Sequence, residues 1–157
     1  MAQRAFSLIE LVVVVVILAV IATIALPRFS STMQNAAYGS FASSMIQFQQ
    51  AMELYRIENG DWPPDGTTGT PHEYFEPYAP IGLFESDGAS PIGGLWDHEH
   101  ESSGIVGFGV HWQNEPLTPD GLSVISRFDL QNDDGNTSTG SARQIDSTRY
   151  YRVLEEP

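Results

Sequence analysis

The longest pattern in the chain is an almost unbroken run of apolar residues from Leu11 to Leu26, which Pro27 closes. Counted from Phe6, the apolar segment has 21 residues, and as a helix rising about 1.5 Å per residue it would be roughly 31 Å long. That length matches the hydrocarbon core of a bilayer. The pattern therefore predicts a transmembrane helix over residues 6–27, with Glu10 as its one charged side chain.

Residues 28–59 change to an amphipathic pattern. Apolar side chains recur every three or four positions and predict one buried helical stripe; they are Ala37, Phe41, Met45, Phe48, Met52 and Tyr55. Asn59-Gly60 is a typical helix end, and Pro63-Pro64 prevents the helix from resuming. We expect one helix of about fifty residues, whose first half lies in lipid and whose amphipathic half packs against a soluble domain.

Residues 60–157 predict a small α+β head domain. The Pro- and Gly-rich stretch 60–94 reads as loop, with a short helix over Tyr74, Phe75 and Tyr78 after the capping-box sequence Thr70-Pro71-His72-Glu73. Alternating patterns predict strands at 106–112, 122–130 and 149–154, with a short edge at Leu95-Trp96. Turns between them favour antiparallel pairing. The expected architecture is a long N-terminal helix packed against a small antiparallel β-sheet head.

The charge of the chain limits its partners. The formal net charge is −13, all seven basic residues are arginine, and no cysteine is present. So acidic a surface repels DNA, and we expect no nucleic acid partner. No nucleophile motif or phosphate loop occurs either, so we expect a structural protein and not an enzyme.

The first ten residues carry the most specific motif. The sequence Ala5-Phe6-Ser7-Leu8-Ile9-Glu10, followed by the apolar run and Pro27, resembles the processing and methylation motif of type IV pilins and type II secretion pseudopilins. The resemblance implies a leader peptide at 1–5, cleavage between Ala5 and Phe6 by a prepilin peptidase, and N-methylation of Phe6. The family usually has Gly where this chain has Ala5.

Glu10 needs a physical explanation whatever the family. A carboxylate at the edge of a membrane costs a few kcal/mol unless it is paired or reaches water. Once the leader is removed, the new amine of Phe6 on a neighbouring copy is a suitable cation, and this pair would set the register between subunits. Snorkelling of Glu10 into the headgroups is the simpler alternative. Pro27 removes a backbone donor and predicts a kink or joint in the helix.

The resemblance also implies partners and a location. It implies a filament built from copies of this chain and related subunits, assembled by an inner-membrane platform with a cytoplasmic ATPase. Arg4 before the span favours a cytoplasmic N-terminus, so the head would be periplasmic. The Asn59-Gly60 ending and the lack of cysteine favour a major type II secretion pseudopilin. A fimbrial or minor pilin for adhesion, motility or DNA uptake is the first alternative, and a membrane-tethered binding domain that never polymerises is the second.

Two clusters could bind metals. Asp129, Asp133, Asp134 and Asn136 surround Gly135 and offer the oxygen ligands that calcium prefers, although the EF-hand register is not kept. Major pseudopilins are known for a calcium loop in a comparable region, and a simple Asx turn is the alternative. The run Asp97-His98-Glu99-His100-Glu101 would place only two histidines on one strand face, which is too few for zinc. We expect that run to be a solvated turn.

Overall fold

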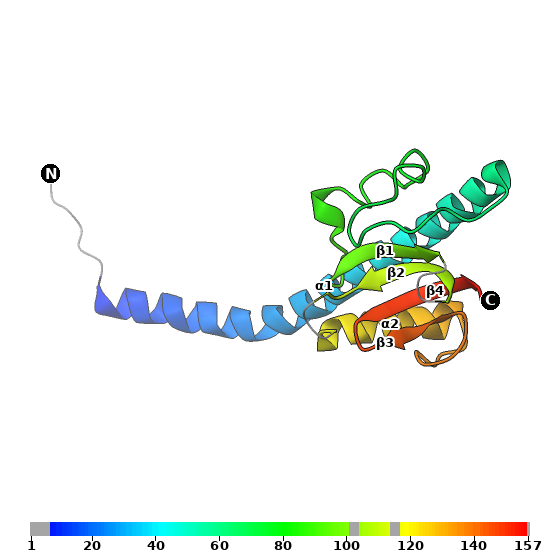
Figure 1. Cartoon of the computed structure of the whole chain (residues 1–157). Coiled ribbons are helices and arrows are strands. Elements are labelled where there is room, and N and C mark those ends of the chain that lie inside the picture. Colours follow the sequence, from blue (N-terminus) through cyan, green and yellow to red (C-terminus); the bar gives the residue numbers. More distant parts are fainter. Residues whose placement is uncertain (1–6, 101–103, 114–116, 157) are drawn as a thin grey trace, which may run out of the picture. The chain divides into compact units, whose positions relative to one another are not determined.

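The computed structural model describes residues 7–100, 104–113 and 117–156 and divides the chain into two compact units. The N-terminal unit comprises residues 1–36, and the head unit comprises residues 37–157. Helix α1 (Leu8–Asn59) contributes to both (Figure 1). Its 52 residues confirm the predicted single long helix. The helix ends at Asn59, as expected from the Asn59-Gly60 sequence. Gly60 has a positive φ of 83°, and its amide donates a hydrogen bond to the Arg56 carbonyl.

In its described residues, the head unit has four strands in one antiparallel sheet: β1 (Leu95–His100), β2 (Val106–His111), β3 (Ala142–Asp146) and β4 (Arg149–Glu155). Their order in the sheet is β1-β2-β4-β3. Helix α2 (Pro119–Asn132) lies between β2 and β3 in the sequence, and a short 3-10 turn covers Ser86–Gly88. The predicted α+β class is confirmed.

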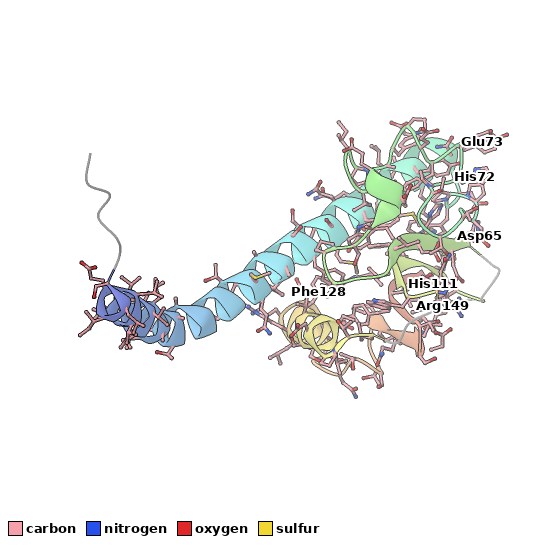
Figure 2. All side chains as sticks on the ribbon, turned by 90° about the vertical axis from the view of Figure 1, so that its left-hand side faces the viewer. Asp65, His72, Glu73, His111, Phe128 and Arg149 are labelled. Atoms are coloured by element: carbon pink, nitrogen blue, oxygen red, sulfur yellow. The ribbon has the colours of Figure 1, made fainter. Side chains whose placement is uncertain are left out.

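The amphipathic half of α1 and helix α2 both contribute to the core on one face of the sheet. Phe41 of α1 stacks on Trp96 of β1 with ring centroids 5.7 Å apart and meets Phe128 of α2 edge-on at 5.4 Å. The ring centroid of Phe48 lies 4.7 Å from that of Phe108 on β2. Figure 2 labels Phe128 on α2. The predicted stripe is buried from Phe41 to Tyr55, and Ala37 packs against its edge.

Phe48 is the centre of this core. Its side chain has no exposed surface and contacts rings on both the sheet and the 60–94 loop. We expect Phe48→Ala to lower the free energy of unfolding by about 3–5 kcal/mol, since a large buried ring leaves a cavity. Urea unfolding of the full chain in detergent measures this. Ile46→Ala, on the half-exposed side of the same helix, is the control and should change it by far less.

Several predicted elements were wrong. Residues 122–130 belong to helix α2 and not to a strand, because the buried positions are spaced by three and four; these are Gly121, Val124, Ile125, Phe128 and Asp129. Thr118 accepts a hydrogen bond from the Gly121 amide and Pro119 follows it, which is a helix start that the alternating pattern concealed. Residues 73–78 form successive turns instead of a helix.

Two strands also differ from expectation. β1 extends through residues 97–100, so Asp97, His98 and Glu99 are buried within the sheet and do not form a solvated turn. β3 was not predicted, because only Ala142 in it is fully buried and its remaining residues are polar. Its pairing with β4 takes the place of the hairpin expected between 122–130 and 149–154.

Candidate functional site

The N-terminal unit presents an apolar helix with one carboxylate near its start. Leu8–Ala25 is long and apolar enough to cross a membrane, and none of its 18 residues is buried within the protein. The positions predicted for processing, Ala5 and Phe6, lie outside the described residues, as does the whole of the 1–5 leader.

Glu10 is bonded to its own helix. Its Oε2 accepts a hydrogen bond of 2.9 Å from the backbone amide of Ser7, one of the donors that a helix start leaves without a partner. The carboxylate also lies at the positive end of the helix dipole, which favours negative charge. Glu10 is exposed in the single chain, so its second oxygen can accept a bond from another group.

Helix α1 continues through Pro27 without a break in its assignment. Proline lacks the amide that would bond four residues back, so one helical hydrogen bond is absent at this position. The predicted kink or joint stays a prediction.

The acidic cluster at the end of α2 brings together three of the four predicted metal ligands. Carboxylate oxygens of Asp129, Asp133 and Asp134 lie within 4.8 Å of one another. Asp129 comes from the last turn of α2, and the other two come from the loop that leads to β3. Three like charges at this separation repel one another unless a cation or protons neutralise them.

Asp129 is the unusual member of the cluster. Its side chain is completely buried, and neither carboxylate oxygen has a hydrogen-bond partner among the described residues. Burial, followed by the charges of Asp134 and Asp133, raises its pKa above the usual range; the Gly135 amide lies near enough to oppose this shift, although it forms no hydrogen bond of normal geometry with the carboxylate. Burying an unpaired polar group is costly, and such groups in folded proteins normally have a partner. A divalent cation in the cluster would give this carboxylate a partner of opposite charge.

The loop after α2 holds the other two carboxylates in place. Asp133 accepts hydrogen bonds from the Ala142 amide at 2.8 Å and from the Ser141 hydroxyl at 2.9 Å. Burial opposes ionisation of Asp133, but these bonds outweigh it and lower its pKa. Asp134 accepts bonds from the Asn136 amide and the Thr139 hydroxyl. Each carboxylate retains lone pairs for a metal, so the donor set fits a hard cation such as calcium.

Asn136, the fourth predicted ligand, takes part in a turn of the same loop. Its side-chain oxygen accepts a hydrogen bond from the Ser138 amide at 3.1 Å, which is the Asx turn considered as the alternative. Gly140 packs tightly beside Asp133, because a Cβ added there would lie 2.0 Å from Asp133 Oδ2. The loop thus shows both an Asx turn and converging carboxylates.

A second polar cluster on the other face of the sheet was missed by sequence reasoning. Tyr151 donates a 2.7 Å hydrogen bond to Asp97, and His111 Nδ1 lies 3.2 Å from the same carboxylate. Arg149 bonds to Glu99 at 2.5 Å. His111 and Arg149, labelled in Figure 2, are register partners on β2 and β4. Burial, followed by the charge of Asp97, raises the pKa of Tyr151, which is therefore neutral at pH 7.

His98 lies on the opposite face of β1 from that cluster, among core rings. Its ring centroid is 5.0 Å from that of Phe75, and burial lowers its pKa, so the ring is neutral. Nε2 lies 3.1 Å from the Pro64 carbonyl oxygen. Within the described part of the chain, the 97–100 segment gathers no set of three ligands for a metal. The pairing of His98 with His100 as zinc ligands has no support in this geometry.

Comparison with known families gives one match. A model of the prokaryotic N-terminal methylation motif matches residues 1–26. No curated protein and no solved structure matches the chain. The match covers the segment that includes Ala5, Phe6 and Glu10, and it supports a type IV pilin-like protein processed by a prepilin peptidase.

Proposed function

We propose that this chain is the structural subunit of a pilin-like filament, cut before Phe6, N-methylated there, and assembled through the N-terminal part of α1. The observation that carries the proposal is the methylation motif at residues 1–26, joined to an apolar helix on which Glu10 is the one charge. A subunit of this kind does mechanical work by polymerising and needs no catalytic group of its own.

The geometry at Glu10 supports a register contact between subunits. Because Oε2 already caps the Ser7 amide, the carboxylate stays near the helix start, and Oε1 can accept a bond from the amine of Phe6 on the next copy. Polar contacts between helices in lipid are modest, on the order of 1–2 kcal/mol at most. The value of this contact is therefore to fix the axial offset between apolar helices that could otherwise slide.

Among pilin-like roles, we propose a type II secretion pseudopilin of the major type, exposed to the periplasm and assembled by an inner-membrane platform and its ATPase. Three features favour it over a fimbrial or minor pilin: the Asn59-Gly60 helix end, the absence of cysteine, and the carboxylate cluster at Asp129. Short periplasmic filaments would support this role, and long surface fibres would favour the fimbrial alternative.

We also propose that the head binds one calcium ion at Asp129, Asp133 and Asp134. Three converging carboxylates, one of them completely buried, are the support for it. The ion would join the end of α2 to the loop before β3, so its effect would be on the stability of the head. Asn136 could contribute its carbonyl oxygen as a fourth ligand, since that oxygen keeps a second lone pair beside its bond to the Ser138 amide.

Processing is the direct test of the proposed function. In a host with an active prepilin peptidase, mass spectrometry of the mature protein should show a chain that begins at N-methylated Phe6. The loss of Arg4 with the leader would make the formal charge −14, one unit below the −13 of the full chain. Ala5→Gly should process at least as completely, since Gly is the usual residue there. An unmodified Met1 in both variants would contradict the proposal.

A further inference from the structure

The charges of the head are strongly segregated along the chain. No basic residue occurs between Arg56 and Arg127, whereas that interval holds twelve acidic residues. Three of these, Glu76, Glu85 and Asp87, line one hollow of about 620 Å³ in the 60–94 loop. All three are exposed, and none has an ion pair among the described residues. This part of the head therefore presents negative charge that its own chain does not neutralise.

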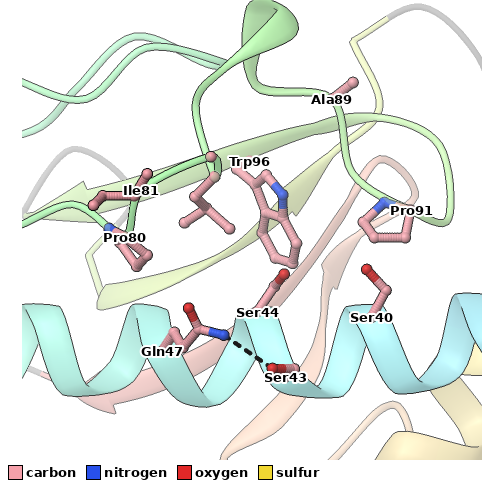
Figure 3. A pocket seen from close by; sticks show the side chains of 11 residues that line it. Ser40, Ser43, Ser44, Gln47, Pro80, Ile81, Ala89, Pro91 and Trp96 are labelled. Carbon is pink, nitrogen blue, oxygen red and sulfur yellow. Dashed lines mark hydrogen bonds between the residues drawn. The ribbon is translucent and has the colours of Figure 1, made fainter.

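An exposed isoleucine lies on the rim of that hollow. Ile81 keeps 99% of its surface exposed. It also lines a second hollow of about 380 Å³, formed with Ser40, Ser43 and Gln47 of α1 (Figure 3). Fully burying an isoleucine contributes about 1.5–3 kcal/mol, and the single chain gains none of this. In residues 80–85, which we call the Ile81 loop, Ile81 is thus an exposed apolar side chain beside acidic ones, whereas Leu83 is buried.

A third hollow, of about 510 Å³, has the complementary chemistry. It is lined by Gln49, Glu53, Arg56, Ile57, Trp62, Ser141, Arg152, Val153 and Leu154. Ile57 is 80% exposed, and Arg152 has only one hydrogen bond within the described chain, a long one of 3.4 Å to the Asn132 carbonyl. Arg56 is already paired with Glu155 at 3.3 Å, and Glu53 accepts a bond from Gln49. Arg152 makes no ion pair with a described residue, although its charge also acts on Asp133, so it is the cation of this hollow that a carboxylate from another copy can pair with. We call this hollow the Arg152 groove.

The Ile81 loop and the Arg152 groove lie on opposite flanks of α1. At 3.6 residues per turn, the mean direction of Ser40, Ser43 and Gln47 lies roughly 145° from that of Gln49, Glu53 and Arg56. The buried stripe that holds Phe48 lies between the two directions. One copy therefore cannot fill its own groove, but a second copy can.

We propose that the Ile81 loop of one copy docks into the Arg152 groove of the next, with Ile81 against Ile57 and Leu154, and Glu85 opposite Arg152. Because the contact joins two different surfaces, it can repeat from copy to copy, and in a filament the repeats form an open helical series and not a closed ring. The inference rests on the proposed filament function and adds to it a contact between heads, separate from the one between N-terminal helices.

Cysteine crosslinking tests this contact on a clean background, because the chain has no cysteine. Filaments of the full-length double variant Ile81→Cys, Ile57→Cys should give a ladder of disulfide-linked multimers on oxidation, seen after the filaments are denatured. Filaments of each single variant should give only uncrosslinked chains. The control pair is Leu130→Cys with Ile57→Cys, since Leu130 is 72% exposed on α2. Assembled filaments whose double variant crosslinks no better than the control pair would overturn the docking and leave the proposed function standing.

Charge reversal tests the polar part of the contact. Glu85→Arg or Arg152→Glu is introduced into the double-cysteine chain. Each should reduce the yield of disulfide-linked multimers by about threefold to fivefold, because each places two like charges opposite one another in the contact. Combining the two should restore it. Glu85→Arg gives the more specific result, since replacing Arg152 would also change the electrostatic environment of Asp133. Unchanged ladders in both single reversals, or no recovery in the combination, would overturn the assigned pair. A parent chain that never polymerises would overturn both proposals.

Discussion

Replacing Glu10 by glutamine is expected to reduce filament assembly by at least about tenfold while the protein stays inserted in the membrane. The amide oxygen of glutamine can still accept the bond from the Ser7 amide, so the helix start keeps its cap. The variant loses only the negative charge that we propose for pairing with a neighbouring amine. A lost contact of about 1.4 kcal/mol corresponds to a factor of ten in an equilibrium constant. Sedimentation of sheared filaments, with immunodetection of the membrane fraction, measures both quantities.

Two comparisons make the Glu10 result specific. Glu58→Gln removes an exposed carboxylate from the outer part of the same helix, outside the hollows proposed for docking, and its amide oxygen can still accept the bond from the Tyr78 hydroxyl, so this variant should assemble as the parent does. Glu10→Ala removes both the charge and the cap. If Glu10→Gln assembled normally and only Glu10→Ala failed, helix capping and not charge pairing would be the role of this residue. Normal assembly of both variants would argue for a tethered domain or for simple snorkelling.

Chelating calcium is expected to lower the melting temperature of the head by about 10 °C in the full chain held in detergent. At a calcium concentration 100 times the dissociation constant, binding stabilises the folded state by about 2.7 kcal/mol. For a unit of this size, about 1 kcal/mol shifts the melting temperature by roughly 4 °C. Circular dichroism melts with calcium, with magnesium and with chelator measure the effect. Magnesium should stabilise less, since it prefers a stricter octahedral geometry.

The variant Asp129→Asn is expected to change the melting temperature in opposite directions with and without calcium. It should abolish the calcium-dependent shift, because the buried ligand loses its charge. In chelator it should melt higher than the parent, since it removes a buried carboxylate with no partner. Asp87→Asn is the control: it neutralises an exposed acid whose φ of 63° asparagine also tolerates. An equal calcium shift in Asp129→Asn and the parent would contradict the proposed site.

The helices could be predicted where the sequence has only one hydrophobic periodicity. The apolar run and the stripe from Phe41 to Tyr55 have a single period each, and nothing in the sequence competes with them. Helix α2 was missed because Leu122, Val124, Phe128 and Leu130 also fit alternation, although Leu122 and Leu130 are exposed in the structure. The Thr118-Pro119 start was the signal that could have corrected the assignment.

The site was predictable only in part, for a related reason. Asp129, Asp133 and Asp134 are close in the sequence, so their convergence follows from a helix end and a tight loop. The burial of Asp129 depends on the packing of α2, which the predicted strand excluded. The cluster of Asp97 with Tyr151 joins residues 54 positions apart, and no local pattern encodes such a pair.

The order of strands sets when the head can fold. β4 is the last of the four strands to be synthesised, yet it lies inside the sheet between β2 and β3. Until it arrives, β2 has no neighbour on that side and β3 has none at all. The nascent head must therefore stay open while its earlier strands are already made, and a chain interrupted before residue 149 would leave the edge of β2 unprotected against pairing with other chains.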